Sequence, residues 1–319
     1  MTSTPHDALV RGIFGQPQYA ADELRCVLPP DVLRELRLET LVLADGAFVD
    51  ERLRASSTDL LFRARLASGG ARFVFILFEH QSTLDERMPL RLLRYQARIW
   101  ERHHAEHRDD THVPPIVSLL LHHGRRPWPW KPRFSSVLAL EAPALAAFGT
   151  SILGFDFLMD DLARVTERQI LDRAMDAVSR LTLVALHGSR DRRPLFEHVA
   201  EAMRELEPEL RAGAAIGPLA RITRYVLSVD DSQPDQIRTA LAAALSTETR
   251  SSVMTAADQL RAEGRLEARR ETLLEILESK FGSVDPSVRR RIESGALEQL
   301  VVWIRRVVGA RSVEEVFAA

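Results

Sequence analysis

The chain has 319 residues, of which 45% are hydrophobic and 28% are charged, and its formal net charge is −2. This composition is typical of a globular protein, and the longest apolar runs fall far short of the roughly 20 residues that a membrane helix needs. The low net charge gives no general attraction to membranes or nucleic acids. We therefore expect a cytoplasmic protein that has no membrane partner. The single cysteine, Cys26, excludes an internal disulfide, and we expect its side chain to be buried.

The first half of the chain begins with helical patterns and continues with strand patterns. Residues 6–15 carry apolar side chains at helical spacing, and residues 20–39 continue as short helices. Two extended pieces are expected on either side of the Asp45–Gly46 turn. Residues 59–66 alternate between apolar and polar side chains, which indicates a half-buried strand.

Residues 73–82, FVFILFEHQS, have apolar side chains on both faces and predict a central strand that is covered on both sides. A long helix is predicted over residues 85–107, and IVSLLLHHG is predicted to be another buried strand. The order is thus helix, three strands, helix, strand. It predicts a mixed α/β sandwich with room for a cleft at the strand ends.

The pattern changes after the segment HHGRRPWPWKPRF and becomes mostly helical. TSILGFDFL is predicted to be a strand, about four amphipathic helices follow, and a longer helix is predicted from residue 258 to Gly282. We predict an α/β domain over residues 1–160, a helical region over 161–250 and a helical tail over 251–319. The leucine stripe of the tail suggests self-association as a homodimer.

Two carboxylates and an amide are predicted to meet at one edge of the sheet. Asp59 begins one strand, while Glu79 and Gln81 end its neighbour and share a face, with His80 pointing away. Neighbouring carboxylates repel unless one is protonated or a cation lies between them, and hard oxygen ligands suit Mg²⁺. Such an ion can polarise a phosphoryl oxygen and activate water. The alternative is that Asp59 is only an edge residue and Glu79 only a strand terminus.

Five segments, in this order, resemble the Rpn family of recombination-promoting nucleases, also described as putative transposases: HDALVRGIF, LPPDVLRELRLETL, FVDERLRASSTDLLF, FILFEHQSTLDERMPLRLLRYQARIW and LLLHHGRRPWPW. The resemblance implies a PD-(D/E)xK core, which is the restriction-endonuclease-like fold, and cleavage of DNA with Mg²⁺, for which Mn²⁺ could substitute. It implies that Asp59, Glu79 and the backbone carbonyl of His80 bind the metal. Asp7, in the family's HD motif, is expected to reach the same cleft as a catalytic residue.

Two positions depart from the family pattern. Gln81 stands where the superfamily has a lysine, and Arg11 stands where the family often has one. An amide can neither act as a general base nor carry positive charge. We therefore expect Gln81 to orient water or a phosphate by hydrogen bonds and the metal to activate the water.

An arginine stripe on the predicted helix 85–107 could hold DNA. Its members, spaced by four, three and four residues, are Arg87, Arg91, Arg94 and Arg98. They could contact phosphates, which would make binding salt-dependent, or they could form a solvated face paired with nearby acidic residues. Arg91 and Tyr95 are favoured as supports of the site.

Two further aromatic or histidine motifs have simpler interpretations. Trp128 and Trp130 could stack on nucleic acid, but packing under their proline-rich loop is more common. His103 and His107, one helical turn apart, lack the other residues of a zinc motif and are expected to face solvent.

The sequence thus supports two hypotheses. The first is a magnesium-dependent DNA endonuclease, linked by the family resemblance to recombination, mobile elements or defence against foreign DNA. The second is a catalytically silent DNA-binding or assembly protein that retains the nuclease fold.

Overall fold

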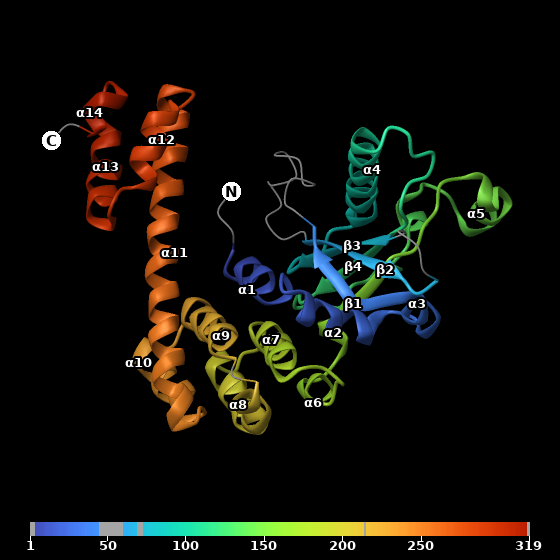
Figure 1. The fold of residues 1–319 in the computed structure, drawn as a ribbon, viewed down its shortest axis with the longest axis horizontal. Helices are drawn as coiled ribbons and strands as arrows, with labels where there is room; N and C mark the ends of the chain where they lie inside the picture. The colour runs from blue at the N-terminus through green and yellow to red at the C-terminus, as the bar shows by residue number, and fades with distance from the viewer. Residues whose placement is uncertain (1–3, 45–59, 69–72, 214, 318–319) are drawn as a thin grey trace.

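The structure, a computed structural model, describes residues 4–44, 60–68, 73–213 and 215–317. Its centre is a five-stranded sheet in the order β1-β2-β3-β4-β5 (Figure 1). The strands are β1 (Leu36–Leu43), β2 (Leu60–Leu66), β3 (Phe73–Gln81), β4 (Ile116–His122) and β5 (Leu158–Asp161). This confirms the predicted mixed α/β class and the central place of β3.

The direction of the strands follows from their connections. β1, β2 and β3 are antiparallel neighbours, whereas β3 and β4 are parallel and are joined through the helix α4 (Met88–Glu106). A parallel pair needs such a crossover because the chain must return to the same end of the sheet. β4 and β5 are also parallel. The carboxyl ends of β1, β3, β4 and β5 therefore lie on one side of the sheet, where polar side chains can collect.

Side-chain alternation along β3 gives the sheet two buried faces. Val74, Ile76 and Phe78 belong to a core shared with α1 (Pro5–Phe14), α2 (Pro17–Val27) and α7 (Ala177–Gly188), while Phe75 and Leu77 pack with α4. Figure 1 shows α4 on one side of the sheet and α1, α2 and α7 on the other. The uninterrupted apolar run of β3 is explained by this position, because a strand between two helical layers has no solvent-exposed face.

Most of the other helices follow the sheet in the sequence. α1 begins sharply because Thr4 and Asp7 form a capping box and Pro5 occupies the first turn. The other helices near the sheet are α2 (Pro17–Val27), α3 (Pro30–Glu35) and α5 (Ala142–Phe148), with α1 spanning Pro5–Phe14. The later helices are α6 (Glu167–Leu171), α7 (Ala177–Gly188), α8 (Leu195–Ala212), α9 (Ile216–Val229), α10 (Pro234–Ala243), α11 (Thr247–Phe281), α12 (Pro286–Glu293), α13 (Leu297–Gly309) and α14 (Val313–Phe317). Short 3₁₀ turns lie at Phe134–Val137, Gly149–Ser151 and Leu162–Arg164.

One hydrophobic core runs from α1 to the start of α11 and so joins residues on both sides of position 160. A separate core holds the end of α11 against α12, α13 and α14. Figure 1 shows these last helices at the far end of α11 from α10. The predicted division at residues 160 and 250 stays a prediction.

Several local predictions were wrong. TSILGFDFL is mostly irregular, and the strand of this region is its downstream neighbour, Leu158–Asp161. The long helix begins at Thr247 and not at residue 258, and Cys26 is exposed because it lies on the outer side of α2. The Asp45–Gly46 turn lies outside the described residues. No helix in the described ranges is both long and apolar enough to cross a membrane.

Candidate functional site

Glu79 and Gln81 lie side by side at the carboxyl end of β3. The Gln81 side-chain amide donates a hydrogen bond of 2.9 Å to Glu79 Oε1, as expected for two residues on the same face of a strand. On that face α4 presents Arg91, whose guanidinium group forms an ion pair with the same Glu79 oxygen. Arg91 also lies 3.6 Å from Asp85. The strand end therefore carries a carboxylate that is held by an amide and a guanidinium.

The Glu79 carboxylate is buried and only partly satisfied. The side chain is 0% exposed, and its second oxygen, Oε2, has no hydrogen-bond partner in the described part of the chain. A buried polar atom without a partner is unfavourable by roughly 1–3 kcal/mol, and more for a charged group. Such an atom is a candidate for contact with a cation or a bound water. Burial also lowers the pKa of Arg91, since it disfavours the charged form.

His80 points to the opposite face of β3, where Asp7 and His123 surround it. Its Nδ1 lies 3.4 Å from Asp7 Oδ1, and its Nε2 lies 2.8 Å from His123 Nδ1. A neutral His80 that donates from Nδ1 to the carboxylate can accept a hydrogen bond from His123 at Nε2. Asp7 thus contacts His80 directly and lies on the other side of the strand from Glu79.

The protonation states of Asp7, His80 and His123 follow from burial and hydrogen bonding. Burial lowers the pKa of His80, and it holds the pKa of His123 well below its usual range with help from the nearby His80 and His6. For Asp7, burial alone would raise the pKa. The contacts with His80 and Thr4 outweigh it, so that the pKa falls to about 2. Asp7 is therefore charged and the two buried histidines are neutral at neutral pH.

The contacts of His80 and His123 continue to two further side chains, His6 and Tyr225, which the sequence did not indicate. The His6 ring packs 4.8 Å from that of His123, and His6 Nδ1 lies 2.8 Å from the Tyr225 hydroxyl group on α9. The dipeptides His6-Asp7, Glu79-His80 and His122-His123 were visible as polar ends of apolar elements. Their meeting depends on tertiary packing, so the pattern alone could not show it.

The proposed metal ligands are only partly described. Asp59 lies outside the described residues. The backbone carbonyl of His80 lies on the β2 side of β3, because backbone groups alternate along a strand and the Gln81 carbonyl accepts from His123 on the β4 side. Within residues 4–44, 60–68, 73–213 and 215–317, no three His, Cys, Asp or Glu side chains cluster as metal ligands. Glu79 Oε2 and the His80 carbonyl are oxygen atoms of the kind that suit a hard cation.

The predicted arginine stripe on α4 is divided. Arg91 turns inward to Glu79, with its side chain 26% exposed. Arg87 and Arg94 are exposed, Arg98 is half-buried, and Tyr95 belongs to the core under α4. Arg11 is exposed on α1. Arg91 therefore supports the Glu79 site, and the exposed members remain the ones accessible to a ligand.

The other aromatic and histidine motifs lie away from Glu79 or in the core. Trp128 is 1% exposed, and its backbone N–H donates to Asp161, so it packs under its loop. His103 is buried and lies 3.6 Å from Asp110, contrary to the expectation that it faces solvent. It is drawn inward by packing against the Phe73 ring at the start of β3.

Comparison with known proteins identifies similar sequences. The family model described as putative transposase, YhgA-like, matches residues 4–211. Recombination-promoting nuclease RpnD of Escherichia coli O157:H7 is 38% identical over 130 residues, which are 40% of this chain and 49% of that protein. The chain thus spans about half the length of RpnD.

Two relatives match over most of their length. Recombination-promoting nuclease RpnA of Escherichia coli strain K12 is 27% identical over 273 residues, covering 82% of this chain and 85% of that protein. The inactive recombination-promoting nuclease-like protein RpnE of the same strain is 27% identical over 281 residues, covering 82% and 83%. No solved structure matches the chain.

Proposed function

Because this chain belongs to the YhgA-like putative transposase family, we propose that it is a DNA endonuclease that hydrolyses phosphodiester bonds with Mg²⁺ as its cofactor. The observation that carries the proposal is the buried Glu79 carboxylate at the end of β3, with one oxygen held by Arg91 and Gln81 and the other without a partner among the described residues. The names of the relatives RpnD and RpnA support a nuclease role.

The fold is compatible with this proposal. The sheet is formed by three antiparallel strands, and β4 then joins β3 in parallel through α4. This is the order of elements that the sequence pattern predicts, and the family resemblance implies the PD-(D/E)xK fold. In that fold the acidic residues lie at adjacent strand ends, which is where Glu79 lies and where Asp59 directly precedes β2.

In this proposal Asp59, Glu79 and the His80 carbonyl would hold the metal, which would supply a Lewis acid for the phosphate and for a bound water. Arg91 and Gln81 keep Glu79 oriented by binding its Oε1 and leave Oε2 free to face the ion. Asp7 and His123 fix the His80 ring from the other face, and so steady the backbone between Glu79 and Gln81. Asp7 thus acts as a positioning residue and not as a third ligand.

DNA is the proposed partner. The exposed Arg94 and the half-buried Arg98 lie on the helix that carries Arg91, and the exposed Arg87 directly precedes it. Phosphates bound there would run along α4 toward the carboxyl end of β3, since Arg87 directly precedes the helix. Binding should then weaken steeply with salt. Self-association through the helices α11 to α14 stays a proposal from the leucine stripe of the sequence, of which Leu273 and Leu277 are buried within the core that these helices form in one chain.

The test is nicking of supercoiled plasmid by the purified chain. We expect cleavage with Mg²⁺ or Mn²⁺, none with EDTA, and a loss of at least 100-fold in Glu79→Gln and Asp59→Asn, since each removes a metal-binding charge. Glu86→Gln is the matched control, because Glu86 is exposed just before α4. Cleavage by Glu79→Gln at the rate of this control would reject the site.

A second function, a catalytically silent DNA-binding or assembly protein, is favoured by specific observations. Arg91 already neutralises Glu79, and Gln81 cannot supply the positive charge of the lysine that the superfamily has there. RpnE, which is named as inactive, is similar over most of the chain. Salt-sensitive DNA binding without cleavage under any divalent cation would select this alternative.

A further inference from the structure

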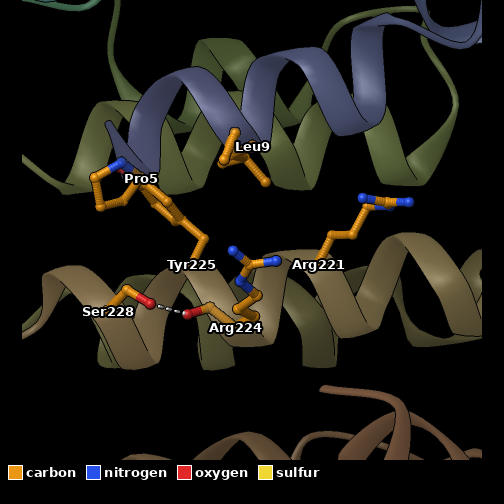
Figure 2. A pocket seen from close by; sticks show the side chains of 7 residues that line it. Pro5, Leu9, Arg221, Arg224, Tyr225 and Ser228 are labelled. Atoms are coloured by element: carbon orange, nitrogen blue, oxygen red, sulfur yellow. Dashed lines mark hydrogen bonds between the residues drawn. The ribbon is translucent and has the colours of Figure 1, made fainter. Parts of the chain in front are cut away.

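A cavity of about 120 Å³ lies between α1 and α9, apart from the Glu79 site (Figure 2). Pro5, Ala8 and Leu9 of α1 form one wall. The opposite wall is formed by Arg221, Arg224, Tyr225 and Ser228 of α9. Figure 2 shows the Arg224 guanidinium group rising from α9 toward Leu9. The cavity therefore presents two cations on one helix to a facing helix that supplies apolar side chains.

These two arginines differ from many others in the protein because no acidic side chain among the described residues pairs with them. Arg173, Arg180 and Arg193, for example, each form ion pairs with carboxylates. Neither Arg221 nor Arg224 forms an ion pair in the described part of the chain, and neither is fully buried. The cavity thus has an uncompensated positive charge, which favours an anionic ligand.

Two glycines inside helices leave room for the side chains of the two arginines. A Cβ atom added at Gly12 of α1 would lie 3.0 Å from Arg221 Cδ and 3.1 Å from its Nη1. A Cβ atom added at Gly264 of α11 would lie 2.5 Å from Arg224 Nη2. Glycine is unfavourable in a helix interior, so two glycines that each face one arginine are a feature that helix stability does not explain. They let both guanidinium groups lie close to the neighbouring helices.

We propose that this cavity binds a phosphate group. The planar guanidinium groups of Arg221 and Arg224 match the oxygens of a phosphate, and both residues line the cavity from positions one helical turn apart on α9. The Ser228 hydroxyl group, which donates to the Arg224 carbonyl, can also accept a hydrogen bond at the edge of the cavity.

The phosphate belongs to DNA, an assignment that rests on the proposed endonuclease function. Pro5 lines the cavity, and two residues later Asp7 contacts His80, which directly follows Glu79. The first turn of α1 therefore joins the cavity to the proposed cleavage site. The cavity lies on the α1 side of the sheet and Glu79 faces α4, so a DNA strand bound at Glu79 would pass around the carboxyl end of β3 to place a backbone phosphate at Arg221 and Arg224.

The test is fluorescence anisotropy of a labelled DNA duplex over a series of salt concentrations, in EDTA so that cleavage is absent. The Arg221→Ala/Arg224→Ala variant should bind roughly tenfold more weakly at low salt. The slope of log affinity against log salt should fall by about one, as expected for the loss of one phosphate contact. Arg204→Ala removes an exposed arginine of α8 and is the matched control.

A variant that keeps the charge provides a second test. Gly264→Ala adds a methyl group that displaces the Arg224 guanidinium group but favours the helix. We expect weaker DNA binding together with an unchanged or higher melting temperature. Gly309→Ala, whose added Cβ would meet nothing within 4 Å, should not affect DNA binding.

The outcomes separate this inference from the proposed function. Loss of affinity and slope in the arginine variant supports the phosphate site even where the wild-type chain cuts no DNA. Wild-type affinity and slope in that variant overturn the site even where the wild-type chain does cut DNA. The last experiment measures the melting temperature with inorganic phosphate. If phosphate raises the melting temperature of the wild type but not of the Arg221→Ala/Arg224→Ala variant, while the two proteins bind DNA equally, the site binds a free anion and the assignment to DNA is overturned.

Discussion

Replacing Arg91 with methionine should destabilise the protein in the absence of divalent cations. Methionine keeps an unbranched stem of similar length but removes the guanidinium group that pairs with Glu79. The carboxylate is 0% exposed, and among the described residues it would retain only the neutral amide of Gln81 as a donor. Removing one partner of a buried ion pair leaves an uncompensated charge, which is strongly unfavourable.

The expected loss is about 3 kcal/mol in the free energy of unfolding. Breaking a buried pair costs about 3–5 kcal/mol, and the low end applies because the Arg91 side chain is 26% exposed and Glu79 can take up a proton in the variant. If Glu79 binds a metal, Mg²⁺ replaces part of the missing charge. The variant should then be stabilised by Mg²⁺ more than the wild type is.

The assay is urea unfolding followed by circular dichroism, with EDTA or with Mg²⁺. Arg94→Met is the control, since Arg94 is exposed on the same helix and its loss should change stability by no more than about 0.5 kcal/mol. Glu79→Met combined with Arg91→Met removes both charges and should recover most of the loss. The reasoning is refuted if Arg91→Met matches Arg94→Met in EDTA, or if the double variant is no more stable than Arg91→Met alone.

Three further predictions concern Asp7 and His123, which surround His80, and the core residue Phe78. Asp7→Asn should lower stability by about 1–2 kcal/mol at neutral pH, because the pKa of Asp7 is 3.8 ordinarily and about 2 when folded; the difference from wild type in urea unfolding should shrink as pH falls from about 4 to 2. The wild type should lose stability below about pH 6.5, because burial lowers the pKa of His123 and only the unfolded chain gains the proton there. His123→Asn should remove this contribution, which amounts to up to ~1.4 kcal/mol per pH unit, and equal pH slopes in the two proteins would contradict this. Phe78→Ala should cost about 3–5 kcal/mol in the same assay, because Phe78 is 0% exposed and stacks with Phe14; a loss below about 1 kcal/mol would show that this part of the core is loosely packed.

Strand periodicity was enough to predict the local geometry of the site. The alternation of side chains along β3 placed Glu79 and Gln81 together and His80 opposite, as the hydrogen bond between Gln81 and Glu79 confirms. The length of the apolar run also predicted that β3 is central and covered on both faces. These features depend on a few adjacent residues and on a period of two, which no distant contact alters.

Contacts between distant segments could not be predicted in this way. The inward turn of Arg91 and the meeting of His6 with Tyr225 depend on how helices pack, and a pattern within one helix does not fix its partner. The prediction of a strand at TSILGFDFL was wrong because a run of β-favouring residues does not show which segment pairs with β4. Asp59, which lies outside the described residues, stays a prediction.

The most direct measurement is a crystal structure of the chain soaked in Mn²⁺, with anomalous diffraction used to locate the ion. We expect a peak beside Glu79 Oε2 and the His80 carbonyl, with Arg91 still bound to the other Glu79 oxygen and Asp59 completing the site. A soaked crystal with Glu79 bound to Arg91 and Gln81 but without an ion at Oε2 would contradict this expectation.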